Sequence, residues 1–328
     1  MRFKNIVCLA VAIFVFSALV LSASRGATAP AKRIYVVNGG NSMVSVIDSK
    51  KNEVAATVRV GVWPAGIAID SASKKAYVAN SNPGDNSVSV IDLKSNTVKT
   101  TIKVGREPMH AAVNPEVKKV YVAHTKENTV SVIDTASNKV VNTVTVGAAP
   151  FDIAAAGKKV YVTNSGGDTV SIIDAVSNKV TATVKCGKGP LGIAVNNTKA
   201  YVVNNGENTV SVINTADNKI VATIKVGRNP WYAAVDAVHN RAYITNRDDA
   251  AVSVIDTTNN KIIETIKVGV KPTGVAVDPE NNRVYVANHK DISVSVIDSA
   301  TNKVINIIKL SLTPDSPYAG SPWGIAVY

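Results

Sequence analysis

The sequence predicts an all-β protein, a seven-bladed β-propeller of four-stranded blades whose first blade is closed by the C-terminal strand. One marker is a tyrosine that recurs at steps of 40 to 44 residues, at Tyr35, Tyr77, Tyr121, Tyr161, Tyr201, Tyr243 and Tyr285. A second is a proline followed by small apolar residues, at Pro64, Pro108, Pro150, Pro190, Pro230, Pro272 and Pro322. No segment after the N-terminus shows a sustained helical period. Repeats of this length and number are typical of β-propellers.

Each repeat reads as four short strands. In the fourth repeat the runs rich in Val, Ile and Thr are Ile153–Ala156, Val160–Asn164, Thr169–Asp174 and Lys179–Lys185. Asn, Gly, Asp and Ser separate them, which is the composition of turns between strands. The aspartates that end the third strands, such as Asp174, are expected to cap these turns.

The order of the two markers predicts how the ring closes. The first tyrosine strand precedes the first proline strand, and the last proline strand, Trp323–Tyr328, has no tyrosine strand after it. We expect this C-terminal strand to complete the blade that begins with Arg33–Gly61. Such closure removes a free sheet edge, and an open solenoid would not need the offset.

The N-terminal residues 1–29 are predicted to be a signal peptide. Arg2 and Lys4 precede an apolar run over Ile6–Leu21, and small residues follow up to Ala29. The alternative is an uncleaved N-terminal anchor. Residues 30–328 then form one propeller domain, without a membrane span after cleavage. We expect an exported protein, located in the periplasm, at the cell surface or outside the cell. The mature part keeps one cysteine, Cys186, so core packing and ring closure must hold the fold without an internal disulfide.

The formal net charge of +12 comes from lysines and arginines that recur with the blades. They begin the tyrosine strands and flank the outermost strands, where charge discourages edge-to-edge association. A nucleic-acid partner is not expected, because aromatic residues are not interleaved with the lysines. A protein or an acidic component of the cell envelope is the favoured partner.

The repeated tyrosine segment also carries a family resemblance. Tyr161–Asn164 reads YVTN and is followed by Val170–Asp174 and by Ser177–Val180, with variants YVAN, YVVN, YITN and YVAH in other blades. This pattern resembles the YVTN β-propeller repeat and covers essentially the whole mature chain. The resemblance implies an exported or surface-layer-like seven-bladed propeller. More distant relatives would be the lactonases and the haem d1 domain of nitrite reductase.

Large aromatic residues gather where the repeat opens on one face. Trp63, Trp231 and Trp323 each lie within one residue of the repeated proline, and so does Phe151. In propellers, the connection into the innermost strand and the segment after the second strand open on the same face. The sequence therefore predicts an aromatic channel mouth, either a recognition surface or a packed plug.

Polar residues interrupt the repeat at the same mouth. Glycine is usual two positions after the repeated proline, but His110, Asp152 and Tyr232 stand there in three blades. His124 replaces the repeated asparagine in blade three. His110, His124 and Asp152 are thus candidate ligands of a transition metal or acid–base groups. Arg106, Arg228 and Arg247 are candidates for binding an anion. The alternative for both sets is a solvated polar rim.

The function predicted is that of an exported, non-enzymatic binding or cell-envelope scaffold that engages its partner through the aromatic mouth. No haem-attachment, nucleophile-elbow, zinc-protease or phosphate-loop motif occurs. No catalytic residue and no cofactor is therefore assigned. The candidate ligand- or partner-binding residues are Trp63, Arg106, His110, Phe151, Asp152, Arg228, Trp231, Tyr232 and Trp323. The alternatives are a propeller enzyme or redox protein with a metal or haem-type cofactor at the mouth, and a lactonase-like hydrolase.

Overall fold

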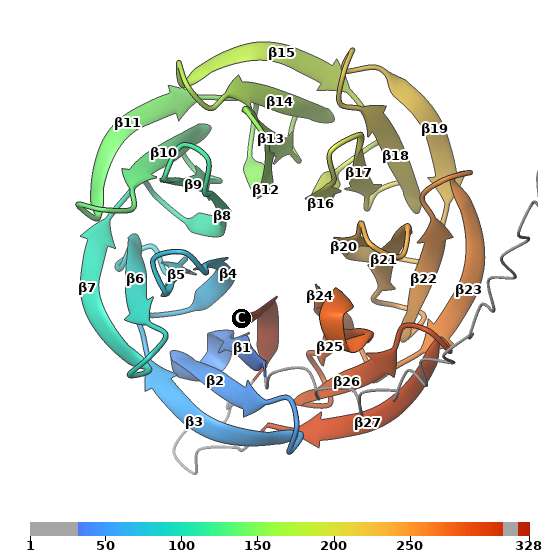
Figure 1. The fold of residues 1–328 in the computed structure, drawn as a ribbon. Coiled ribbons are helices and arrows are strands. Elements are labelled where there is room, and N and C mark those ends of the chain that lie inside the picture. Colours follow the sequence, from blue (N-terminus) through green and yellow to red (C-terminus); the bar gives the residue numbers. More distant parts are fainter. Residues whose placement is uncertain (1–31, 311–320) are drawn as a thin grey trace, which may run out of the picture. The chain divides into compact units, whose positions relative to one another are not determined.

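Each repeat folds into one four-stranded antiparallel sheet, and seven such sheets surround a central axis (Figure 1). The computed structural model describes residues 32–310 and 321–328. The predicted signal peptide, residues 1–29, lies outside the described residues. Within the described residues no helix is long and apolar enough to cross a membrane.

The strands of each blade follow one another from the axis outward. Blade 1 contains β28 (Pro322–Val327), β1 (Arg33–Asn38), β2 (Met43–Asp48) and β3 (Glu53–Arg59). Blade 2 contains β4 (Pro64–Asp70), β5 (Lys75–Asn80), β6 (Ser87–Asp92) and β7 (Thr97–Lys103). Blade 3 contains β8 (Pro108–Asn114), β9 (Lys119–His124), β10 (Thr129–Asp134) and β11 (Lys139–Thr145). Blade 4 contains β12 (Pro150–Ala156), β13 (Lys159–Asn164), β14 (Thr169–Asp174) and β15 (Lys179–Lys185).

The remaining three blades repeat the same order. Blade 5 contains β16 (Pro190–Val195), β17 (Lys199–Asn204), β18 (Thr209–Asn214) and β19 (Ile220–Lys225). Blade 6 contains β20 (Pro230–Asp236), β21 (Arg241–Asn246), β22 (Ala251–Asp256) and β23 (Lys261–Lys267). Blade 7 contains β24 (Pro272–Asp278), β25 (Arg283–Asn288), β26 (Ser293–Asp298) and β27 (Lys303–Lys309). Two short 3-10 turns, η1 (Gly39–Asn41) and η2 (Pro279–Asn281), lie between strands.

The predicted closure of the ring is confirmed. Strand β28 pairs antiparallel with β1, with Tyr35 opposite Ala326 and Val36 opposite Ile325. The amide of Tyr328 donates to the carbonyl of Arg33 at 2.8 Å, and the amide of Arg33 donates back at 2.9 Å. Figure 1 shows the two ends of the chain's colour scale, blue and dark red, meeting in blade 1. The first and last strands thus share one sheet.

Apolar side chains on the second and third strands of each blade form the core between neighbouring blades. The seven repeated tyrosines are almost wholly buried. Tyr161 and Ile172 of blade 4, for example, share one cluster with Ile193 and Val202 of blade 5. The fourth strands are instead mostly exposed: β3 alternates between exposed and covered positions, and β11 and β23 cover a single residue each.

The lysine or arginine that begins a tyrosine strand joins its blade to the next one in blades 1 to 6, whereas Arg283 of blade 7 binds Asp298 of its own blade. Lys119 Nζ of blade 3 donates to the carbonyl of Ala175 and to Asn178 Oδ1 of blade 4, both at 3.1 Å. Equivalent contacts start from Lys75, Lys159, Lys199 and Arg241. These cations therefore act between blades, whereas the sequence suggested only a general structural role for them.

The inner strands are longer than predicted, because each contains a β-bulge. Strand β12 begins at Pro150 instead of Ile153, and β13 begins at Lys159 instead of Val160. Pro150 pairs with Asn164 and Ile153 pairs with Val162, so one extra residue is accommodated between them. The same shift recurs after the repeated proline of every blade. Bulges of this kind redirect side chains, and in this protein they redirect those at the channel mouth.

Candidate functional site

The residues in the bulges supply most of the side chains at the channel mouth. The two positions after the repeated proline are Met109–His110 in β8, Phe151–Asp152 in β12, Trp231–Tyr232 in β20 and Trp323–Gly324 in β28. In the remaining blades glycine or a small residue is usual, since a Cβ on Gly192 would lie 2.5 Å from the carbonyl of Trp231. The mouth is therefore lined in the blades where a large side chain replaces the usual glycine or the small residue before it.

His110, Asp152 and Tyr232 meet at the axis although they come from three different blades. His110 Nδ1 lies 3.2 Å from Asp152 Oδ1, and His110 Nε2 lies 2.9 Å from Tyr232 Oη. The side chains of His110 and Asp152 are 13% and 8% exposed. The His110–Tyr232 contact spans the axis between blades 3 and 6. The sequence singled out these three positions, and the structure brings them together.

The Asp152 carboxylate is held entirely by groups of the protein. The amide of Ile153 donates to Oδ1 at 2.8 Å and the amide of Ile193 donates to Oδ2 at 2.9 Å. Burial raises the pKa of Asp152, while the neighbouring His110 lowers it. Burial, together with the negative charge of Asp152, raises the pKa of Tyr232 well above its usual value. Tyr232 is thus a neutral hydrogen-bonding group at ordinary pH, and it is not poised to ionise.

Aromatic rings extend from this trio toward the outside. Phe151 lies 6.1 Å from the Tyr232 ring and 6.2 Å from the Trp231 ring. Trp231 lies 5.2 Å from Trp323. The rings of His289 and Trp323 meet edge to face at 5.0 Å. Three of the four predicted mouth aromatics, Phe151, Trp231 and Trp323, therefore form one continuous set with Tyr232 and His289, drawn from blades 1, 4, 6 and 7, and Trp63 lies outside this set.

A cavity of about 740 Å³ opens beside Trp323. Trp63 and Trp323 line it, together with Met109 and His289, and small residues of blades 1 and 2 complete it. Trp63 is 59% exposed and has a positive φ of 52°. Trp323 lies against Gly39, where an added Cβ would come within 2.9 Å of the indole. This cavity has the size and the largely apolar walls of a small-molecule site.

Arg247 lies over two rings of the same aromatic set. Its Cζ lies 4.2 Å from the centroid of the Trp231 ring and 5.6 Å from that of Trp323. Nε of Arg247 is buried without a hydrogen-bond partner. Burial lowers the pKa of Arg247. Burial, together with the positive charge of Arg247, also lowers the pKa of His289, which is therefore a neutral imidazole at neutral pH.

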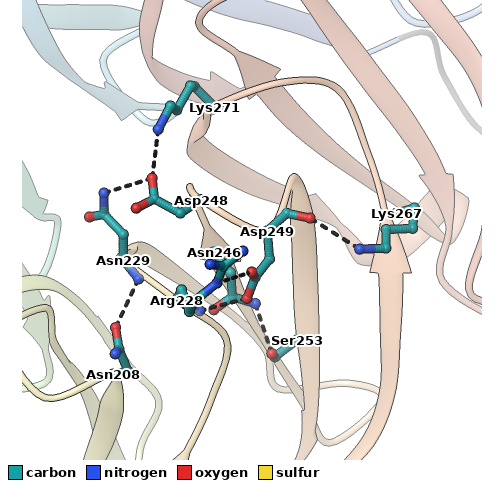
Figure 2. A network of polar contacts seen from close by, with 9 residues as sticks. All are labelled: Asn208, Arg228, Asn229, Asn246, Asp248, Asp249, Ser253, Lys267 and Lys271. Atoms are coloured by element: carbon teal, nitrogen blue, oxygen red, sulfur yellow. Dashed lines mark hydrogen bonds and ion pairs between the residues drawn. The ribbon is translucent and has the colours of Figure 1, made fainter.

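The other two arginines proposed as anion-binding groups are already paired on the rim. Arg106 Nε lies 3.3 Å from Glu127 Oε1. Arg228 Nε donates to Asp249 Oδ1 at 2.7 Å, and its backbone amide donates to Oδ2 at 2.6 Å. Figure 2 shows this network, in which Lys271 also binds Asp248. Of the three arginines, Arg247 alone keeps an unpaired guanidinium within the described residues.

His124 does not join His110 and Asp152. It is fully buried between β9 and β10, where its Nε2 lies 2.8 Å from Ser131 Oγ. Other blades place asparagine there with the same partner, as Asn164 Nδ2 donates to Ser171 Oγ at 2.9 Å. Among the described residues no three His, Cys, Asp or Glu side chains gather closely enough to hold a metal ion. The candidate trio is thus split into a channel pair and a separate structural histidine.

Met109 and His289 were not among the site residues predicted from the sequence. The sequence also did not distinguish Arg247 from Arg106 and Arg228, which the structure shows to be paired. The missed signal is the residue directly after the repeated asparagine. That position holds Ser81 in blade 2 and Ser165 in blade 4, whose hydroxyls donate to the backbone of the connection that leads into the same blade. In blades 6 and 7 the larger Arg247 and His289 stand there instead and reach the mouth.

Two family models match parts of the sequence. The seven-bladed β-propeller lactonase model matches residues 43–221, and the cytochrome D1 haem domain model matches residues 196–317. Neither is the YVTN-repeat family that the motif resembles. A search of curated proteins finds no match.

Solved structures share the fold at low identity. Hydrazine synthase of Kuenenia stuttgartiensis is 22% identical with a TM-score of 0.74, over 81% of this chain and 92% of that one. A functionally unknown protein of Desulfotomaculum acetoxidans is 12% identical with a TM-score of 0.76, over 90% and 98%. The dihydro-haem d1 dehydrogenase NirN, solved in complex with DHE, is 16% identical with a TM-score of 0.65, over 90% and 66%.

These structural similarities establish the fold and no more. The lactonase model, by contrast, spans more than half of the 328 residues. Its match agrees with the seven four-stranded blades of this structure. This chain belongs to the seven-bladed β-propeller lactonase family.

Proposed function

We propose that this protein is an exported binding propeller that engages its ligand at the aromatic mouth and does not transform it. One observation carries the proposal: Trp63 stands largely exposed, in a left-handed backbone conformation, at the edge of the 740 Å³ cavity. A bulky residue in that conformation is an outlier. The equivalent slots of other blades hold Glu107, Ala149, Gly189, Asn229 and Lys271. The fold therefore does not require tryptophan there, and a recognition role accounts for it.

The buried trio supports binding more than catalysis. The ring nitrogens of His110 and the oxygens of Asp152 and Tyr232 already have partners inside the protein. A catalytic base needs a proton of the substrate within hydrogen-bond reach. These three groups instead bind one another and the backbone across the inner strands.

The partner that we propose is a component of the cell envelope or of the exported fraction. The predicted signal peptide and the basic balance of the chain motivate this choice. A mouth that combines aromatic rings with a cation suits a ligand that presents a flat apolar group.

The test uses the purified protein and its tryptophan fluorescence. Fractions of envelope extract are added to the wild type and to Trp63→Ala and Trp323→Ala. We expect a fluorescence change in the wild type that both variants lose. Val238→Ala is the control, since Val238 is exposed beyond the far end of β20. Equal binding by the wild type and both tryptophan variants would contradict the proposal.

Lactone hydrolysis is the second candidate, favoured by the family match and by the His110–Asp152 pair. In this case Asp152 would orient His110, which would act as the base once a ligand displaced Tyr232 from Nε2. A panel of lactones monitored by pH-stat tests it. Turnover lost in His110→Ala would support hydrolysis, whereas an inert wild type would remove this candidate.

The match to the cytochrome D1 haem domain raises the question whether the mouth suits a haem-type group. His289 lines the cavity, and its Nδ1 is buried without a hydrogen-bond partner. Its depressed pKa keeps the imidazole in the neutral form that metal coordination requires. Arg247 is a partner for carboxylates. These residues fit such a group, which would supply redox or ligand-binding chemistry when bound. A visible absorbance band on protein purified from its native host, lost in His289→Ala, would reveal it.

A further inference from the structure

We propose that the mouth binds an aromatic ligand that carries an anionic group, and that the Arg247 guanidinium binds this anion. The inference rests on the proposed binding function and adds the chemical class of the ligand. A carboxylate, a sulfonate and a phosphate all present anionic oxygens that accept hydrogen bonds from a guanidinium.

The guanidinium of Arg247 forms no ion pair at the mouth with any residue that the structure describes. Its side chain makes no hydrogen bond and no ion pair, although it is partly buried. The rim cations nearby are paired, Arg228 with Asp249 and Lys271 with Asp248. A charge removed from water is costly unless it is paired and hydrogen-bonded. A bound anion would provide that pairing.

The acidic residue next in sequence, Asp248, raises the pKa of Arg247 through its charge but forms no ion pair with it. The Asp248 carboxylate accepts from Lys271 Nζ at 2.6 Å and from Asn229 Nδ2 at 3.0 Å, as Figure 2 shows. Asp248 is thus held by Asn229, in the connection between blades 5 and 6, and by Lys271, in the connection between blades 6 and 7. The positive charge at the mouth is therefore retained in the folded protein.

Two indole rings lie against the guanidinium. The Cζ atom of Arg247 lies over the ring of Trp231 and near that of Trp323, in cation–π contact. The N–H donors of a guanidinium point outward from its edge, in a fork that matches a carboxylate, sulfonate or phosphate. Held against two indoles and without a hydrogen-bond partner at Nε, the Arg247 guanidinium is available to an anion.

The cavity supplies the place for the remainder of the ligand. Trp323 belongs both to the cavity wall and to the pair of rings beside Arg247. A flat ring stacked on Trp323 and facing Trp63 would bring a substituent at its edge toward the guanidinium. The neutral His289 adds a polar contact without a second charge. The arrangement selects one anionic group on an apolar, planar body.

The experiment compares two fluorescent probes that differ in their charge. Anilinonaphthalenesulfonate and phenylnaphthylamine share their ring system, and only the first carries a sulfonate. Each is titrated into the wild type, Arg247→Gln, Arg228→Gln and Trp323→Ala. We expect the wild type to bind the sulfonate at least about tenfold more tightly than the neutral probe. We expect Arg247→Gln to lose about tenfold for the sulfonate alone, which is the scale of one charge-assisted hydrogen bond. Arg228→Gln, whose arginine is paired on the rim, should leave both affinities unchanged.

The outcomes separate this inference from the proposed function. If Trp323→Ala weakens both probes but Arg247→Gln weakens neither, the mouth binds ligands and the anion site is wrong. If neither probe depends on Trp323, both proposals fail. Thermal unfolding checks that Arg247→Gln is folded. Should it not fold, the salt dependence in the wild type decides, because only the sulfonate affinity should fall as ionic strength rises. Equal salt dependence of the two probes would overturn the inference.

Discussion

Trp63 shows how a single residue can conflict with its backbone position and still be compatible with the fold. A left-handed residue other than glycine or asparagine costs about 1–2 kcal/mol. The side chain is also mostly exposed, so the small area that it buries offsets little of this strain. Blade 6 has Asn229 in the same slot, and asparagine tolerates the left-handed region.

We therefore expect Trp63→Asn to keep the stability of the protein and to abolish ligand binding at the mouth. Relief of strain should offset the lost contacts, so the free energy of unfolding in urea should change by less than about 1 kcal/mol. Glu107→Asn, in the same slot of blade 3, is the matched control and should leave binding unchanged. A loss of several kcal/mol in Trp63→Asn alone would show that Trp63 is a packing residue.

His124 predicts a pH dependence of stability. Burial lowers its pKa from about 6.5 in the unfolded chain to about 4 in the fold. Below pH 6.5 the unfolded chain takes up a proton that the folded protein does not, so stability falls as the pH decreases toward 4. A shift of this size corresponds to about 3 kcal/mol.

Urea unfolding between pH 7 and pH 4 should measure this loss, and His124→Asn should remove it. Asparagine keeps the bond to the serine of the next strand, as Asn164 does with Ser171. Asp152 has a raised pKa and contributes with the opposite sign, so the difference between variant and wild type isolates His124. His239→Asn is the control. Parallel pH profiles for His124→Asn and wild type would contradict the assignment.

The repeat allowed the mouth positions to be found but not their partners. His110, Asp152 and Tyr232 stand out because each replaces a glycine, and they do meet. Whether a charged side chain is already paired depends on its neighbours in the ring. Arg228 and Arg247 look alike in the sequence, yet one reaches Asp249 and the other stacks on two tryptophans.

At the scale of the strand, the bulge explains why the site lies where it does. Strict alternation along β20 would direct Trp231 and Tyr232 to opposite faces of the sheet. The extra residue between Pro230 and Ala233 bends the strand instead, and both rings reach the mouth. Composition predicts a strand but does not reveal a bulge, because the signal is a register shift against a partner strand. This is why the inner strands were predicted too short.

The lysine that begins a tyrosine strand is expected to stabilise the contact between two blades. Lys119→Met should cost about 1–2 kcal/mol of stability, since it removes two hydrogen bonds from a charged donor to blade 4. Tyr121 Oη also donates to the carbonyl of Ala175, which limits the loss. Thermal and urea unfolding provide the measurement.

Lys139→Met is the control from the same blade, because Lys139 is exposed at the start of the outer strand β11. Its effect should stay within about 0.5 kcal/mol. Equal effects of the two substitutions would show that the contacts between blades add nothing beyond general surface charge.

At the scale of the whole ring, closure depends on one sheet that holds both ends of the chain. Sheet pairing of β28 with β1 adds backbone hydrogen bonds to the packing that joins any two neighbouring blades. The sequence predicted this closure correctly, because the offset between the two repeat markers fixes it without any knowledge of side-chain contacts.

Two circular permutants would measure what the shared sheet contributes. In both, a short Gly-Ser linker joins Tyr328 to Lys32, which is feasible because Tyr328 pairs with Arg33. One permutant opens at Gly157, between β12 and β13, so the new ends again share a blade. The other opens at Ala148, between β11 and β12, so the new ends lie in different blades.

We expect the permutant opened at Ala148 to unfold at a lower urea concentration than the one opened at Gly157. Its ends are held only by side-chain packing between blades 3 and 4, whereas the other keeps backbone hydrogen bonds across its ends. Both permutants retain all seven four-stranded sheets and the same linker, so the comparison isolates closure. Equal urea midpoints would mean that packing between blades suffices to close the ring. In that case the shared sheet would serve mainly to cover a free strand edge.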